Sequence, residues 1–150
     1  SMQFWKVCFL IFAMAVAREA QKFLIPVIGA ENGIHTTFVG HVAFMSQMES
    51  LIAAPVGGFL MECLGILPLT LVSLLMSAVG IQVLCMPGMD FYVQGASMLG
   101  LGCGLCAGAV IALSILHAPE DGKQRKTFMN GCRFCNSSAD VIIPIFVGAL

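Results

Sequence analysis

Five long apolar stretches, separated by short turns, occupy almost the whole chain. They lie at about residues 4–28, 38–60, 66–86, 93–116 and 131–150. A helix needs about 20 mostly apolar residues to cross the hydrocarbon core of a bilayer, and these stretches reach that length. Strands of a membrane barrel would alternate apolar and polar residues over about ten positions, whereas these stretches are continuous. The sequence therefore predicts an all-α fold, a single polytopic transmembrane bundle of five helices.

The composition favours a bundle in lipid over a domain in water. Of the 150 residues, 59% are hydrophobic and 10% are charged, whereas soluble domains carry about 25% charged residues. The net charge is −1 and the sequence has no basic patch with interleaved aromatic residues, so we expect no nucleic-acid partner. The expected partner is the lipid bilayer. Because the sequence begins Ser1-Met2 and stops inside an apolar stretch, we also expect it to be a piece of a larger chain or assembly.

The connections between the stretches set an expected orientation. Turn-forming residues occur at 31–33, 65–68 and 86–90, and residues 118–126 form the one strongly polar loop. With five spans, the N-terminus, the second–third turn and the fourth–fifth loop share one side. That side carries Lys6, Lys123, Arg125 and Lys126, and the opposite loops carry no Lys or Arg. Since Lys and Arg accumulate in cytoplasmic loops, we expect the basic side to face the cytoplasm, or the matrix or stroma of an organelle.

The fourth stretch carries glycines at helical spacing. Gly100, Gly104 and Gly108 recur every four residues and would form a smooth groove on one helix face. Small residues in this pattern let two membrane helices approach closely. The groove is either a sliding contact used in function or ordinary helix packing.

The first stretch is interrupted by three charged residues. Arg18, Glu19 and Lys22 fall near its middle, where ionisable groups are costly unless they face a polar cavity or one another. One hypothesis is that they line a central cavity that binds a charged solute. The other is that the helix is shorter and these residues lie at the membrane surface.

The fifth stretch carries a polar face. Arg133, Asn136, Ser137 and Asp140 are spaced at i, i+3, i+4 and i+7, which places them on one side of a helix. This face indicates a path for substrate or protons. For Arg133 alone, the alternative is a side chain that extends to the membrane interface.

Two further patterns have a functional and a structural interpretation. Glu49 and His41 lie on broadly the same side of the second stretch; they would either relay protons or form a structural pair. The pairs Cys103/Cys106 and Cys132/Cys135 have metal-ligand spacing, but they fall within predicted spans rather than on the tight loops typical of zinc sites. We expect no metal, no cofactor and no enzyme activity, because no catalytic motif occurs.

Three segments together resemble one half of a major facilitator superfamily transporter. Residues 55–65 are similar to the family's Gly-x-Leu-Ala-Asp-Arg-x-Gly-Arg-Arg signature, with matches at Gly58, Glu62 and Gly65. The glycine-rich fourth stretch runs into a polar loop that contains Pro and Glu, as in the family. The fifth stretch resembles the family's fifth helix by its Gly and Pro residues, at Pro144 and Gly148.

The chain departs from the family signature in one respect. Cys63, Ile66 and Leu67 stand where the family has basic residues that help latch the cytoplasmic side. The resemblance therefore implies a weak or absent latch, as in a C-terminal half or a divergent member.

The resemblance implies a solute transporter that works by alternating access, or a fragment of one. Such transporters hold substrate near the midplane between two six-helix halves, so a second half or other membrane subunits would cover the polar face. The implied solute is small and anionic or polar, bound by Arg18, Lys22 and Arg133. Glu19, Glu49 and Asp140 would be counter-charges or proton acceptors, and Asn136 would also line the cavity. The alternative function is a structural or assembly subunit of a larger membrane complex, without transport.

Overall fold

A computed structural model describes residues 2–148, and these are almost entirely helical. The helices are α1 (Met2–Glu31), α2 (Thr36–Leu64), α3 (Ile66–Leu84), α4 (Met89–Leu105), α5 (Ala109–Leu116) and α6 (Gly122–Gly148). No strand occurs among the described residues. The all-α prediction is confirmed.

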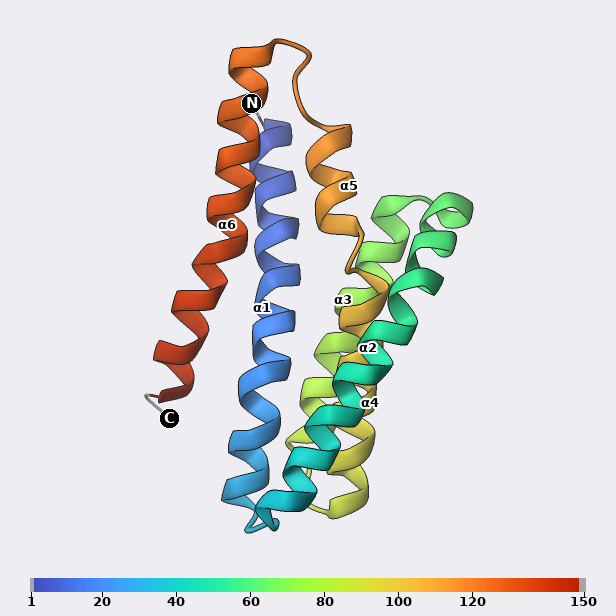
Figure 1. Cartoon of the computed structure of the whole chain (residues 1–150), viewed down its shortest axis with the longest axis vertical. Helices are drawn as coiled ribbons and strands as arrows, with labels where there is room; N and C mark the ends of the chain where they lie inside the picture. Colours follow the sequence, from blue (N-terminus) through green and yellow to red (C-terminus); the bar gives the residue numbers. More distant parts are fainter. Residues whose placement is uncertain (1, 149–150) are drawn as a thin grey trace.

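The helices form two groups that meet along α1 (Figure 1). α1 and α6 run side by side in the same direction, and α2, α3 and α4 pack together on the other side of α1. The first turn of α1, the α2–α3 turn and the α5–α6 connection lie at one end of the bundle. The α1–α2 and α3–α4 turns lie at the other end. Successive long helices therefore alternate in direction, as an up-and-down bundle requires.

The predicted fourth helix is wrong in one respect, because it is broken in two. The helix stops at Leu105 and resumes at Ala109. Within the break, the Ala107 amide donates to the carbonyl of Gly104, three residues earlier, which is a tighter turn than an α-helix makes. Several glycines surround this point, and each costs a helix about 1 kcal/mol relative to alanine. Glycines placed for close packing thus also weaken the helix.

The predicted polar loop at residues 118–126 is also partly wrong. α6 begins at Gly122 rather than near Gly131, so the basic residues of that loop lie in its first turns. Asp121 explains the early start: its carbonyl accepts from the Arg125 amide at 2.8 Å and its carboxylate accepts from the Lys123 amide at 3.4 Å. An aspartate before the first turn is a favourable N-cap. The expected end at Leu150 lies outside the described residues.

The remaining helices match the predicted stretches with small shifts at their ends. α2 extends to Leu64, four residues past the predicted end at residue 60. The turns that follow α1, α2 and α3 contain Gly33, Gly65 and Gly88, whose φ angles are 65°, 87° and 126°. These positive angles favour glycine, and the three glycines therefore mark where the chain turns back between helices.

The contact between α2 and α4 depends on glycine. A Cβ added to Gly100 would collide with the backbone carbonyl of Ser46, and one added to Gly104 would collide with the carbonyl of Ser50. Gly57 of α2 meets the carbonyl of Leu105 in the same way. Gly108 differs, because it meets only the flexible tip of Met61 at 3.3 Å. Gly100 and Gly104 therefore lie where the α2 and α4 backbones approach closely, whereas Gly108 does not.

Two helical stretches among the described residues are long and apolar enough to cross a membrane. They are Ile66–Leu84, which is α3, and Met89–Leu116, which contains α4 and α5. α1, α2 and α6 are also long, yet charged or polar side chains interrupt their apolar stretches.

Candidate functional site

Five of the predicted site residues form a connected group in which Arg18 joins α1 to α6. Arg18, Glu19 and Lys22 project from α1, and Asn136 and Asp140 project from the facing part of α6. The Arg18 guanidinium donates to the Asn136 side-chain oxygen at 3.3 Å and lies 3.9 Å from the Asp140 carboxylate. We call this group the α1–α6 cluster. Its two cations and two carboxylates carry no net charge.

Charge is distributed unevenly within the α1–α6 cluster. Glu19 is buried, with 5% of its side chain exposed, and it accepts from the Lys22 ammonium at 2.6 Å. Arg18 lies farther from the same carboxylate, at 3.6 Å. Lys22 therefore neutralises Glu19, while each contact of Arg18 is long. Because 43% of the Arg18 side chain is exposed, its guanidinium is accessible to another anion.

Arg133 does not join the α1–α6 cluster. It is exposed and borders a hollow of about 500 Å³ on the surface of α6, together with Arg125, Lys126 and Asn130. Among the described residues, none lies within ion-pair distance of Arg133. The predicted polar face of the fifth helix is therefore divided between two places.

Glu49 belongs to a second polar site, between α2 and α4. Its Oε1 accepts from the Ser97 hydroxyl at 2.9 Å, while its Oε2 is buried and has no hydrogen-bond partner in the described part of the chain. A pocket of about 220 Å³ lies beside it, bordered also by His41 and Val93. Glu49 and His41 thus share a pocket, as their spacing predicts, but no hydrogen bond between them is found in this structure.

The three residues matched to the family signature do not form a loop together. Gly58 and Glu62 lie within α2, where Glu62 is exposed and a Cβ on Gly58 would meet open space. Gly65 alone makes the turn, and its amide donates to the carbonyl of Met61 at 3.0 Å. The predicted end of the second helix at residue 60 is wrong, because α2 continues to Leu64 and includes Glu62.

A buried hydrogen-bond network was not predicted from the sequence. Gln21 of α1 donates to the Ser46 hydroxyl of α2 at 2.8 Å, and that hydroxyl donates to the carbonyl of Ala96 on α4 at 2.7 Å. Gln21 and Ser46 are at most 2% exposed. The sequence signal for this network is Gln21, an amide side chain inside the first apolar stretch and next to its charged residues.

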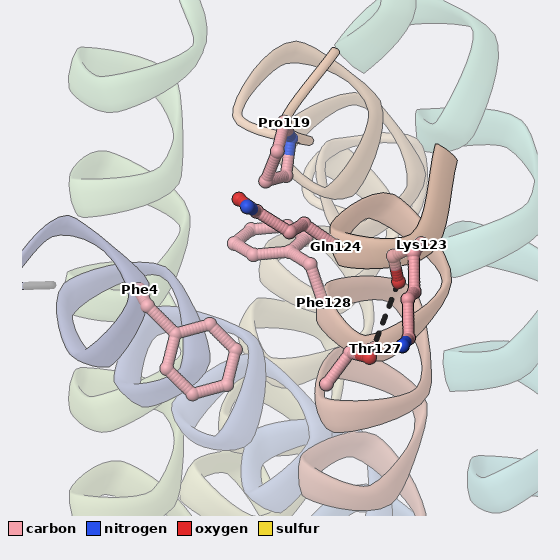
Figure 2. Close-up of a pocket in the computed structure, with 6 residues that line it drawn as sticks. All are labelled: Phe4, Pro119, Lys123, Gln124, Thr127 and Phe128. Atoms are coloured by element: carbon pink, nitrogen blue, oxygen red, sulfur yellow. Dashed lines mark hydrogen bonds between the residues drawn. The ribbon is translucent and has the colours of Figure 1, made fainter. Parts of the chain in front are cut away.

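A separate hollow of about 410 Å³ lies at the end of the bundle where α1 and α6 begin. Figure 2 shows Phe4 of α1 facing Lys123, Thr127 and Phe128 of α6, with Pro119 at the rim. The Phe4 and Phe128 rings meet edge to face, with centroids 5.4 Å apart. The hollow is mostly apolar and lies away from the α1–α6 cluster, so it adds no residue to that site.

The cysteines are all free thiols, four of them buried. Cys8, Cys106 and Cys132 belong to one apolar core cluster where α1, α5 and α6 meet. Within residues 2–148, no group of three or more His, Cys, Asp or Glu side chains is arranged to hold a metal.

Comparison with known proteins adds no relative. No protein family, curated protein or solved structure matches this chain.

Proposed function

We propose that this chain is a multi-pass membrane protein of the major facilitator type, whose α1–α6 cluster binds a small anionic solute during transport. The observation that carries the proposal is the position of Arg18. This residue lies near the midpoint of α1, 43% of its side chain is exposed, and its guanidinium approaches Asp140 and Glu19 only to 3.9 and 3.6 Å. A cation held this loosely on a membrane helix favours a site for an anion.

The outer surface supports a bundle surrounded by lipid. Large apolar side chains are more than half exposed on several helices, among them Phe44, Leu51, Phe59, Leu71, Leu75, Ile111, Ile115, Phe134, Val141 and Ile145. Only 28% of the α3 stretch is buried within the chain, whereas the core helix of a soluble protein would be mostly buried. An apolar surface of this extent is stable where lipid covers it.

The polar helices fit the same proposal. Arg18 of α1 lies against Asn136 and Asp140 of α6, so a protein face rather than lipid covers one side of the cluster. Ionisable residues in membrane helices pair in this way or face a water-filled cavity. We therefore propose five spans: α1, α2, α3, α4 with α5, and α6. The end of the bundle that bears Lys123, Arg125 and Lys126 would face the cytoplasm, matrix or stroma.

Solute binding would exchange one anion for another on Arg18. Lys22 already neutralises the buried Glu19, so that carboxylate does not compete for the solute. Asp140, half-exposed and 3.9 Å away, is the group that an incoming carboxylate or phosphate would displace from the guanidinium. A solute that binds one of two alternating states more tightly shifts their balance. A second half, or a partner subunit, would complete the cavity.

Uptake into proteoliposomes tests the proposal. Labelled lactate, succinate and inorganic phosphate serve as probes, and the variants are R18Q and D140N, with R125Q as a matched control on the surface of α6. We expect R18Q and D140N to impair uptake of a transported probe while their insertion is unchanged, and R125Q to transport normally. If both cluster variants take up the probe as the wild type does, the α1–α6 cluster is not the solute site.

A structural or assembly subunit is the second candidate function. It is favoured by the α2–α3 turn, where Cys63, Ile66 and Leu67 replace the basic residues of the family signature. It is also favoured by the compensated charges of the cluster. This function predicts co-purification with other membrane subunits in fixed stoichiometry, together with no uptake of any probe.

A further inference from the structure

The Glu49 carboxylate is only half satisfied by its surroundings. Its Oε1 accepts one hydrogen bond, from Ser97 at 2.9 Å. Its Oε2 is buried and lacks any partner among the described residues, and none of the ion pairs in this part of the chain includes Glu49. A buried carboxylate oxygen without a donor is unfavourable. The site is therefore short of one hydrogen-bond donor, and of a positive charge if Glu49 is ionised.

The pocket beside Glu49 limits which ligand could supply the missing hydrogen-bond donor and positive charge. Its volume is about 220 Å³, less than the roughly 300–1,000 Å³ typical of sites for drug-sized ligands, so the ligand is small. Apart from Glu49, Ser97 and His41, the walls are apolar. They comprise Phe38, Val42, Met45 and Val93. One acidic group in a mostly apolar pocket matches a ligand with one cationic donor on a short apolar body.

We propose that this pocket binds a small organic ammonium ion, whose N–H group donates to the Glu49 Oε2 and whose alkyl group packs against Phe38, Met45 and Val93. Hydrogen bonds between an ammonium and a carboxylate are stronger than neutral ones. A bare metal ion fits less well, because it would need several oxygen or nitrogen ligands, and the walls offer only Glu49, Ser97 and His41 as polar side chains. An anion would meet the carboxylate charge directly.

The ammonium site is distinct from the α1–α6 cluster and does not depend on transport. It lies between α2 and α4, whereas the cluster lies between α1 and α6, and the two share no residue. Binding to the full chain can therefore be measured whether or not any solute is moved.

Calorimetric titration of the full purified chain with n-butylammonium tests the inference at neutral pH, where the amine is protonated. 1-Butanol tests whether the charge is needed, and tetramethylammonium tests whether the N–H donor is needed. We expect saturable binding of n-butylammonium and weaker binding of the other two probes. E49Q should weaken n-butylammonium binding roughly 10-fold or more, as expected from the loss of a charge-assisted hydrogen bond.

A matched control and a second test variant complete the experiment. E62Q removes an exposed carboxylate from the same helix and should bind n-butylammonium as the wild type does. V93F keeps Glu49 but fills the pocket, and should also weaken binding, which keeps the test decisive if E49Q fails to fold. Absence of saturable binding to the wild type overturns the inference. Equal binding by folded E49Q overturns it, and so does undiminished binding by V93F.

Discussion

Glu19 shows how one buried charge organises its neighbours. Its side chain is 5% exposed, yet two cations lie within 4 Å because α1 places Lys22 one turn after it and Arg18 directly before it. Removing the partner of a buried charge is far more costly than breaking an exposed ion pair. Lys22 therefore stabilises the α1–α6 cluster even though half of its own side chain is exposed.

The variant K22M should lower the free energy of unfolding. We expect a loss of about 1–2 kcal/mol, less than the 3–5 kcal/mol of a fully buried pair, because Lys22 is half-exposed and Arg18 remains near Glu19. Thermal unfolding in detergent measures the loss. The double variant E19Q/K22M should recover most of it, and K126M, at an exposed position, should change little. Equal stability of K22M and the wild type would show that Glu19 does not need this partner.

The sequence predicted which residues of the site share a helix face, but not which faces meet. Arg133, Asn136 and Asp140 are spaced alike, yet only the last two contact Arg18. α6 runs in the same direction as α1, so Arg133, which precedes Asn136 and Asp140 in α6, faces a part of α1 that precedes Arg18. Residues 7 to 17 of α1 are all apolar, so α1 offers Arg133 no charged partner there. Spacing within one helix carries no information about the neighbouring helix. The sequence could not predict the unpartnered Oε2 of Glu49 for the same reason, because the surroundings of that carboxylate depend on how α4 packs against α2.

At the scale of elements, the same glycines account for a correct and an incorrect prediction. Their spacing predicts close packing, and Gly100 and Gly104 do lie against the α2 backbone. The hydropathy of the fourth stretch predicts one continuous helix, but the helix is interrupted at residues 106–108. An apolar pattern reports what is buried, whereas helix continuity also depends on backbone propensity, which is low where glycines gather.

Replacing glycine by alanine should have opposite effects at two positions in the helices. G100A adds a Cβ where the Ser46 carbonyl already lies, so α2 and α4 must separate, and overpacking of this kind costs about 1–3 kcal/mol. G58A meets open space within α2 and should stabilise the helix by up to about 1 kcal/mol. The melting temperatures of the two variants in detergent give the comparison. A G100A protein as stable as G58A would mean that the two helices are not in close contact.

At the scale of the whole molecule, the alternation of helices assigns every turn to one of two ends. Turn residues and apolar lengths were enough to predict this order, because a short connection leaves a long helix no choice but to reverse. The sequence could not show how the helices group around α1, since that grouping depends on side-chain fit between distant segments. The proposed membrane orientation places the two ends on opposite sides of the bilayer. One exposed cysteine near each end of α3 allows this to be tested.

Cys63 and Cys85 should react with thiol reagents from opposite sides of a membrane. Cys63 lies near the α2–α3 turn and Cys85 directly follows α3, so the length of α3 separates them, and both are exposed. In bacterial spheroplasts, where Lys and Arg hold their loops in the cytoplasm, a membrane-impermeant maleimide should label Cys85 in intact cells. Cys63 should react only after permeabilisation. The variants C63S and C85S assign each signal, and the buried thiols of Cys8, Cys103, Cys106 and Cys132 should stay unreactive until the protein unfolds. Labelling of both exposed cysteines in intact cells would contradict a membrane-spanning α3, whereas labelling of Cys63 alone would keep the span and reverse the proposed orientation.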